Sequence, residues 1–127
     1  MKLAIIFVAG FIGLALADEN TWRFPTDRIT TEQWQMYLDE TLALPGVHSY
    51  EVANQLIVED PNNKAIYVFT TPAHPAHPAV VKRQVIQKGG MISISRKGHF
   101  AGDQAAYDHW WHEFDDLDKR VKGSAPK

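Results

Sequence analysis

Six large apolar side chains recur at helical spacing near the end of this 127-residue chain, and this stripe constrains the fold more than any other feature. Residues three and four positions apart share one face of an α-helix, so the segment predicts an amphipathic helix whose aromatic face must be covered by another element. Asp103 precedes the segment at a position suited to an N-cap. The stripe consists of Tyr107, Trp110, Trp111, Phe114, Leu117 and Val121.

A second helix is expected after Thr30, which has Gln33 at capping-box spacing, and Pro45-Gly46 should end it. Between the two helices the apolar pattern changes to a period of two, which is typical of strands. Four strands are expected, over residues 50–58, 65–71, 79–87 and 91–97. The first is expected to contain a bulge near residues 53–55, and the last two are joined at Gly89-Gly90. The predicted fold is therefore α+β, with an N-terminal helix, a four-stranded antiparallel meander and a C-terminal amphipathic helix.

The first seventeen residues have the pattern of a cleavable secretory signal peptide. Lys2 precedes an apolar run to Leu16, and Ala15-Leu16-Ala17 has the small-x-small pattern that signal peptidase accepts, so cleavage is expected between Ala17 and Asp18. The run is shorter than the about 20 residues of a spanning helix, although an uncleaved anchor is the alternative. We expect a single domain over residues 18–122, a disordered tail over 123–127 and no stable membrane anchor after cleavage.

The chain contains no cysteine, which excludes a disulfide framework, thiol catalysis and a zinc–thiolate site. A small exported domain without disulfides favours a bacterial periplasm, with the extracellular space as the alternative. The formal net charge is −2 at pH 7, so there is no basic surplus to bind nucleic acid.

Two histidine pairs raise the hypothesis of a metal site. His74 and His77 lie in a tract with proline at every third position from Pro72 to Pro78, which favours polyproline II and would hold both imidazoles outward, roughly 9 Å apart. A rigid connector is the favoured interpretation of this loop, and with Pro75 the two histidines are the candidate contacts for a partner. His109 and His112 are expected on the solvent face of the last helix. No cofactor is expected, and a divalent transition metal bound by these four histidines is the alternative.

Two arginines are predicted to face each other across the second hairpin. A two-residue turn at Gly89-Gly90 places Arg83 opposite Arg96 on the more apolar face. Like charges directly opposite are destabilising, so the pair needs a compensating negative group. This can be an anionic ligand or, in the favoured interpretation, an internal carboxylate such as Glu51, Glu59 or Asp103.

No common catalytic motif occurs in the chain: there is no G-x-S-x-G elbow, H-E-x-x-H pair, phosphate loop or dinucleotide fingerprint. His99 lies in a glycine-flanked tract that is expected to be a loop entering the last helix, which is a suitable place for a general base. No nucleophile or paired carboxylate is identifiable beside it. A non-enzymatic function is therefore favoured, and an enzyme with a base near His99 is the alternative.

The tract from Phe69 to Ala79, together with Ala101-Gly102-Asp103 and the aromatic helix, resembles a family of small exported bacterial proteins of unassigned function. The resemblance implies export and a single domain, and it brings no catalytic residues. The leading hypothesis is a soluble, non-enzymatic periplasmic protein that binds a protein or a small anionic partner, as an envelope accessory factor or an inhibitor or immunity protein. A metal-binding or metal-buffering protein is the alternative. The candidate contacts are His74, Pro75, His77, Arg83, Arg96 and His99.

Overall fold

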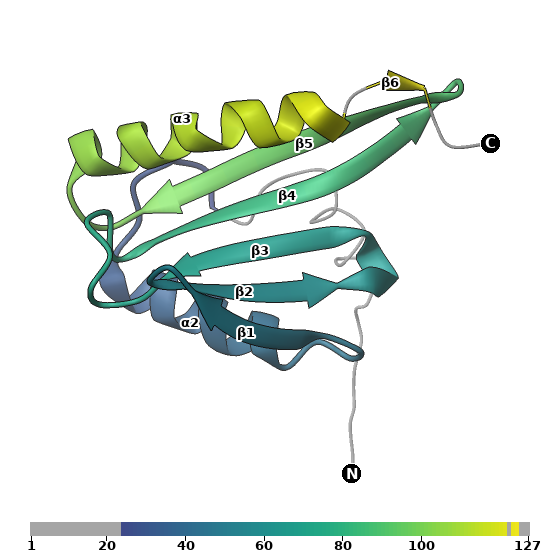
Figure 1. Ribbon diagram of the computed structural model, residues 1–127. Helices are drawn as coiled ribbons and strands as arrows, with labels where there is room; N and C mark the ends of the chain where they lie inside the picture. The colour runs from purple at the N-terminus through teal and green to yellow at the C-terminus, as the bar shows by residue number, and fades with distance from the viewer. Residues whose placement is uncertain (1–23, 122, 125–127) are drawn as a thin grey trace, which may run out of the picture.

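The computed structural model describes residues 24–121 and 123–124, so the predicted signal peptide and its cleavage between Ala17 and Asp18 lie outside the described residues. Two helices, α2 (Thr31–Leu42) and α3 (Gln104–Val121), pack against one antiparallel sheet whose six strands follow sequence order (Figure 1). The α+β class is confirmed, with two strands more than expected. The strands are β1 (His48–Val52), β2 (Gln55–Asp60), β3 (Ala65–Thr70), β4 (Ala79–Lys88), β5 (Met91–Phe100) and β6 (Gly123–Ser124).

Both helices begin where their capping residues predict. The Thr30 hydroxyl accepts a hydrogen bond from the Gln33 amide at 3.0 Å, and the Gln33 side chain accepts one from the Thr30 amide at 2.9 Å. This reciprocal pair is the predicted capping box of α2. At the start of α3, the Asp103 carboxylate accepts from the Ala106 amide at 2.8 Å.

The sheet has a hydrophobic core on each face, because successive strand residues point to opposite sides. Tyr67 and Phe69 pack with Trp34 of α2, whereas the intervening Val68 packs with Trp110 of α3. The two helices therefore cover opposite faces, which explains why β3 is buried along most of its length. In Figure 1, α2 lies behind the β1–β3 part of the sheet, while α3 runs beside β5.

The expected first strand is two strands joined by a tight turn, so the predicted bulge at residues 53–55 is wrong. Val52 pairs with Gln55, which leaves a loop of two residues, Ala53 and Asn54, with φ of 53° and 63°. Positive φ at both positions is the requirement of a type I′ hairpin turn, which usually contains glycine. The absence of glycine here removed the usual hairpin signal.

The C-terminal end differs from the expected disordered tail, because Gly123 and Ser124 pair with β5 as the short strand β6. The remaining residues, 125–127, lie outside the described part. Within residues 24–121, neither helix is long and apolar enough to span a membrane.

Candidate functional site

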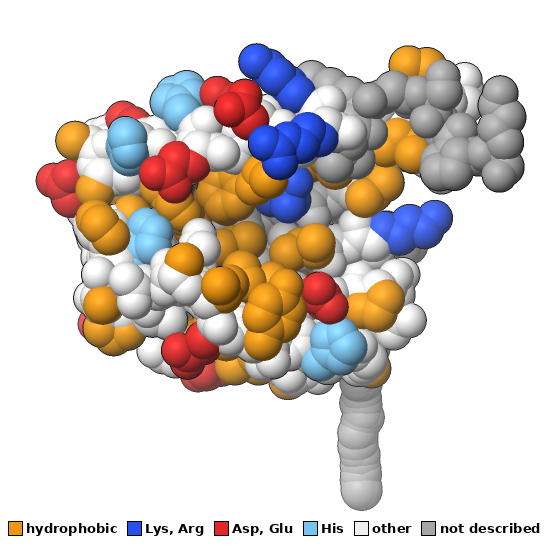
Figure 2. Space-filling model, viewed as in Figure 1, with side chains coloured by type: hydrophobic (Ala, Val, Ile, Leu, Met, Phe, Trp, Pro, Cys, Tyr) orange, Lys and Arg blue, Asp and Glu red, His pale blue; other side chains and the backbone are white. Residues whose placement is uncertain are grey.

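An apolar groove lies between α3 and β1, on the face of the sheet that α3 covers only in part. Figure 2 shows hydrophobic side chains gathered in the band between α3 and β1, with Lys and Arg side chains above its right-hand half. Two adjoining hollows of about 490 and 320 Å³ share Ile66 and Arg83 in their linings, so they form one continuous trough. The larger hollow extends past Val85 and Ile94, and the smaller one past Ile57 and Phe114. The groove is thus lined by aliphatic side chains of the strands together with Phe114 of α3.

The rims of the groove expose large apolar side chains to solvent. Tyr50 on β1 is 49% exposed and Leu117 on α3 is 42% exposed. Both line the groove, from opposite sides. The sequence predicts Leu117 on the covered stripe of its helix, whereas in the structure it is partly exposed and lines the groove. An apolar hollow with exposed apolar rims is typical of a surface that binds a partner.

The predicted arginine pair occurs in the expected register, and Arg83 is the member that lines this groove. Arg83 is directly opposite Arg96 across β4 and β5. Asp118 of α3 bridges them: its carboxylate accepts from Arg83 Nε at 2.8 Å and from Arg96 Nη1 at 3.0 Å. Asp115 accepts from Arg96 Nη2 at 2.6 Å, and this hydrogen bond is the main reason that the pKa of Asp115 is lowered. The internal ion network is confirmed, and its carboxylates come from α3.

The carboxylates predicted to neutralise the arginines, Glu51, Glu59 and Asp103, do not pair with them in the structure. Glu59 hydrogen-bonds His48 at 3.0 Å at the far rim of the groove, while Glu51 is exposed on β1 and Asp103 caps α3. Asp118 is buried, and it lies four residues after Phe114 on the covered side of the helix. An acidic residue at helical spacing within an apolar stripe was the signal that could have identified it. Two arginines and two aspartates leave no net charge here, so the network does not select an anionic ligand.

The tract with His74, Pro75 and His77 folds as two successive turns, so the predicted polyproline II conformation is wrong. The His74 amide donates to the Thr71 carbonyl at 2.9 Å, and the His77 amide donates to the His74 carbonyl at 3.1 Å. These bonds curl the chain, whereas polyproline II has no internal hydrogen bonds. Pro75 remains exposed at the surface.

Each histidine of this loop contacts a tryptophan on a different helix. The His77 ring packs edge-on against Trp34 of α2, and the His74 ring packs against Trp110 of α3, both with ring centroids 5.0 Å apart. His77 Nδ1 also hydrogen-bonds the Thr70 hydroxyl at 2.8 Å. Partial burial lowers the pKa of both imidazoles. The loop therefore links the two hydrophobic cores, and its imidazoles do not project outward as a pair.

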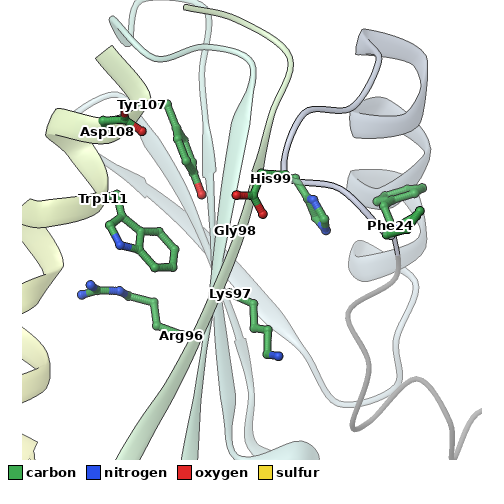
Figure 3. A pocket seen from close by; sticks show the side chains of 10 residues that line it. Phe24, Arg96, Lys97, Gly98, His99, Tyr107, Asp108 and Trp111 are labelled. Atoms are coloured by element: carbon green, nitrogen blue, oxygen red, sulfur yellow. The ribbon is translucent and has the colours of Figure 1, made fainter. Parts of the chain in front are cut away.

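His99 lies within β5 rather than in a loop, and its side chain is fully buried. Its Nδ1–H donates to the Thr26 carbonyl at 2.8 Å, and its ring packs edge-on against Phe24 with centroids 5.2 Å apart. Burial lowers the pKa of His99 to about 4, so the imidazole is neutral at pH 7. Arg96 precedes it by three residues and points to the opposite face of β5. Arg96 and His99 both line one hollow at the edge of this strand, from opposite sides, whereas Arg83 does not line it (Figure 3).

His109 and His112 lie on the solvent face of α3, as predicted. His109 contacts Glu113 at 3.4 Å and His112 contacts Asp115 at 3.1 Å. Among the residues that the structure describes, no group of three or more His, Asp or Glu side chains has the geometry to hold a metal ion.

The hollow lined by Arg96 and His99, of about 420 Å³, is separate from the groove and straddles the outer edge of β5 near Gly98. Figure 3 shows Tyr107 and Trp111 on one side of this strand, with the Tyr107 hydroxyl directed at Gly98, and His99 on the other side beside Phe24. A Cβ at position 98 would overlap the Tyr107 hydroxyl and lie 3.0 Å from the Trp111 ring. Glycine is therefore required for α3 to approach β5 this closely.

Gly98→Ala is expected to destabilise the fold by about 1–3 kcal/mol, because the added methyl group overpacks the contact between β5 and α3. Urea unfolding followed by tryptophan fluorescence measures this change. Lys97→Ala, at the adjacent exposed position, is the control and should change stability by about 0.5 kcal/mol or less. Equal stability of the two variants would show that Tyr107 moves aside without cost.

Comparison of the chain with protein-family models, with curated proteins and with solved structures gave no match. The resemblance to small exported bacterial proteins therefore stays a prediction. The groove and its contacts are the basis for the functional proposal.

Proposed function

We propose that this chain is a small, non-enzymatic binding protein that acts after export, in a periplasm, and that an apolar segment of a partner protein binds in the groove between α3 and β1. The observation that carries the proposal is the groove between α3 and β1, where α3 leaves part of this face of the sheet uncovered. Helices packed side by side have axes about 8–10 Å apart, so a partner segment lying alongside α3 would cover the exposed floor. The predicted signal peptide and the lack of a catalytic motif support the same function.

The chemistry of the groove favours an apolar polypeptide over the small anionic ligand that the paired arginines first indicated. Asp118 and Asp115 already neutralise Arg83 and Arg96. The lining of the groove also includes the charged side chains Glu59, Lys64 and Glu113. The large apolar side chains that it exposes to a ligand are Leu117 on one wall and Tyr50 on the other. Such a surface gains binding free energy by removing apolar area from water.

Leu117→Lys tests the groove without disturbing the core. Leu117 is already 42% exposed, so lysine should fold normally while placing a charge on the groove wall. We expect the variant to lose capture of the partner from periplasmic extract, and to lose most of the fluorescence of the apolar dye ANS that the unchanged protein shows.

Met36→Lys on α2 is the matched control, because Met36 is also 42% exposed and lies on the other helix. It should capture the same partner and bind the dye as the unchanged protein does. Undiminished capture of that partner by Leu117→Lys would contradict the groove as the binding site.

A further inference from the structure

Strand β1 forms one edge of the sheet (Figure 1). All five of its residues are exposed. In the part of the chain that the structure describes, β2 is the only strand paired with it. Tyr50 and Val52 of this strand are 49% and 51% exposed. Natural edge strands are usually protected by lysine, proline, a bulge or a covering element. The sequence His-Ser-Tyr-Glu-Val contains no lysine or proline, and its pairing with β2 is continuous.

The turn after β1 determines which backbone groups point outward. Because the hairpin loop has two residues, the flanking pair Val52 and Gln55 is hydrogen-bonded in both directions. Hydrogen-bonded and non-hydrogen-bonded pairs alternate along an antiparallel ladder, so Tyr50 also directs its backbone groups at β2. Ser49 and Glu51 are the intervening residues. Their N–H and C=O groups therefore face away from the sheet.

We propose that two copies of this chain pair through β1, antiparallel, about a twofold axis at Tyr50. This register pairs Ser49 with Glu51 of the partner subunit. By the twofold symmetry, Glu51 pairs in the same way with Ser49 of the partner subunit. The four outward N–H groups of Ser49 and Glu51 in the two copies then all donate to carbonyls across the interface. Tyr50 lies opposite Tyr50 of the partner subunit, and aromatic cross-strand pairs are stabilising. The occupant that fits this edge is thus a second copy of the same strand.

Charge and length select this register over the neighbouring symmetric ones. An axis at Glu51 would place two carboxylates directly opposite each other, which is unfavourable. An axis at Ser49 would place Glu51 opposite Val47, which lies outside β1, so fewer strand residues would pair. The axis at Tyr50 uses all five residues, and it places the two Glu51 carboxylates diagonally, about 7–8 Å apart, rather than directly opposite each other. It also joins the two sheets edge to edge, with the Tyr50 walls of the two grooves in contact.

The pairing is tested by light scattering after size exclusion at 100 μM protein, where we expect a dimer. Glu51→Pro removes one outward N–H without removing a bond to β2, so it should fold and elute as a monomer. Glu51→Ala keeps the N–H and should remain a dimer. Circular dichroism confirms that both variants are folded. A monomer at 100 μM for the unchanged chain, or an undiminished dimer for folded Glu51→Pro, would overturn the proposal.

The absence of cysteine allows a direct test of the register. Non-hydrogen-bonded partners have Cα atoms about 4.5 Å apart, within the range of a disulfide, so Tyr50→Cys should form a cross-linked dimer on mild oxidation. Ser49→Cys and Glu51→Cys place like positions about 7–8 Å apart diagonally and should cross-link far less. Preferred cross-linking at position 49 or 51 would refute the axis at Tyr50. Leu117→Lys should stay dimeric, so failure of the groove proposal and failure of the dimer proposal give different results.

Discussion

Asp118→Ala is expected to lower the free energy of unfolding by about 3–5 kcal/mol, the largest effect of any substitution considered for this chain. The carboxylate bridges Arg83 and Arg96, whose side chains are 15% and 13% exposed. Without it, two cations lie directly opposite each other on β4 and β5, and only the more exposed Asp115 remains to compensate one of them. Urea unfolding at pH 7 and low salt measures the loss.

Asp116→Ala is the matched control, because Asp116 is on the same helix and exposed, and it should cost about 0.5 kcal/mol or less. If unpaired charge is the cause, the triple variant Arg83→Met, Arg96→Met and Asp118→Leu should recover most of the stability that Asp118→Ala loses. A loss below about 1 kcal/mol for Asp118→Ala would show that water compensates the arginines, and that the network contributes little.

The sequence predicted best those features that depend on neighbouring residues. The capping box at Thr30 and the two-residue turn at Gly89-Gly90 each act over a few positions, and both occur as expected. The turn also gave the correct pairing of Arg83 with Arg96. The β1–β2 turn acts over the same short range, but Ala53 and Asn54 do not include the glycine by which such turns are usually recognised.

The remaining features depend on contacts between distant elements. Proline spacing favours polyproline II locally, but this preference is overridden by the rings of Trp34 and Trp110, which hold His77 and His74 inward. The groove depends on how far α3 extends across the sheet, which no local pattern specifies. Asp118 combines a local and a distant feature. Its spacing from Phe114 places it on the covered side of the helix and can be read from the sequence, but its pairing with Arg83 and Arg96 depends on how α3 packs on the sheet.

Acidification from pH 7.5 to 4.5 is expected to reduce the free energy of unfolding by about 2–3 kcal/mol through His99 alone. The folded chain holds the pKa of His99 at about 4, because the imidazole is fully buried. The unfolded chain has the ordinary value near 6.5, so below that pH it binds a proton that the folded chain does not. Stability therefore falls as the pH drops from about 6.5 and levels off below about 4. The lowered pKa values of His74 and His77 act in the same direction.

His99→Gln separates this contribution from the others, since glutamine does not titrate and can still donate to the Thr26 carbonyl. Urea unfolding at pH 7.5, 6.5, 5.5 and 4.5 should show a smaller decline for His99→Gln than for the unchanged protein. His109→Gln, at an exposed histidine of α3, should keep the full decline. Equal pH dependence in the unchanged protein and His99→Gln would mean that water reaches the imidazole. In that case β5 would open near Phe24 at low cost, and the core between this strand and α2 would be weaker than its burial indicates.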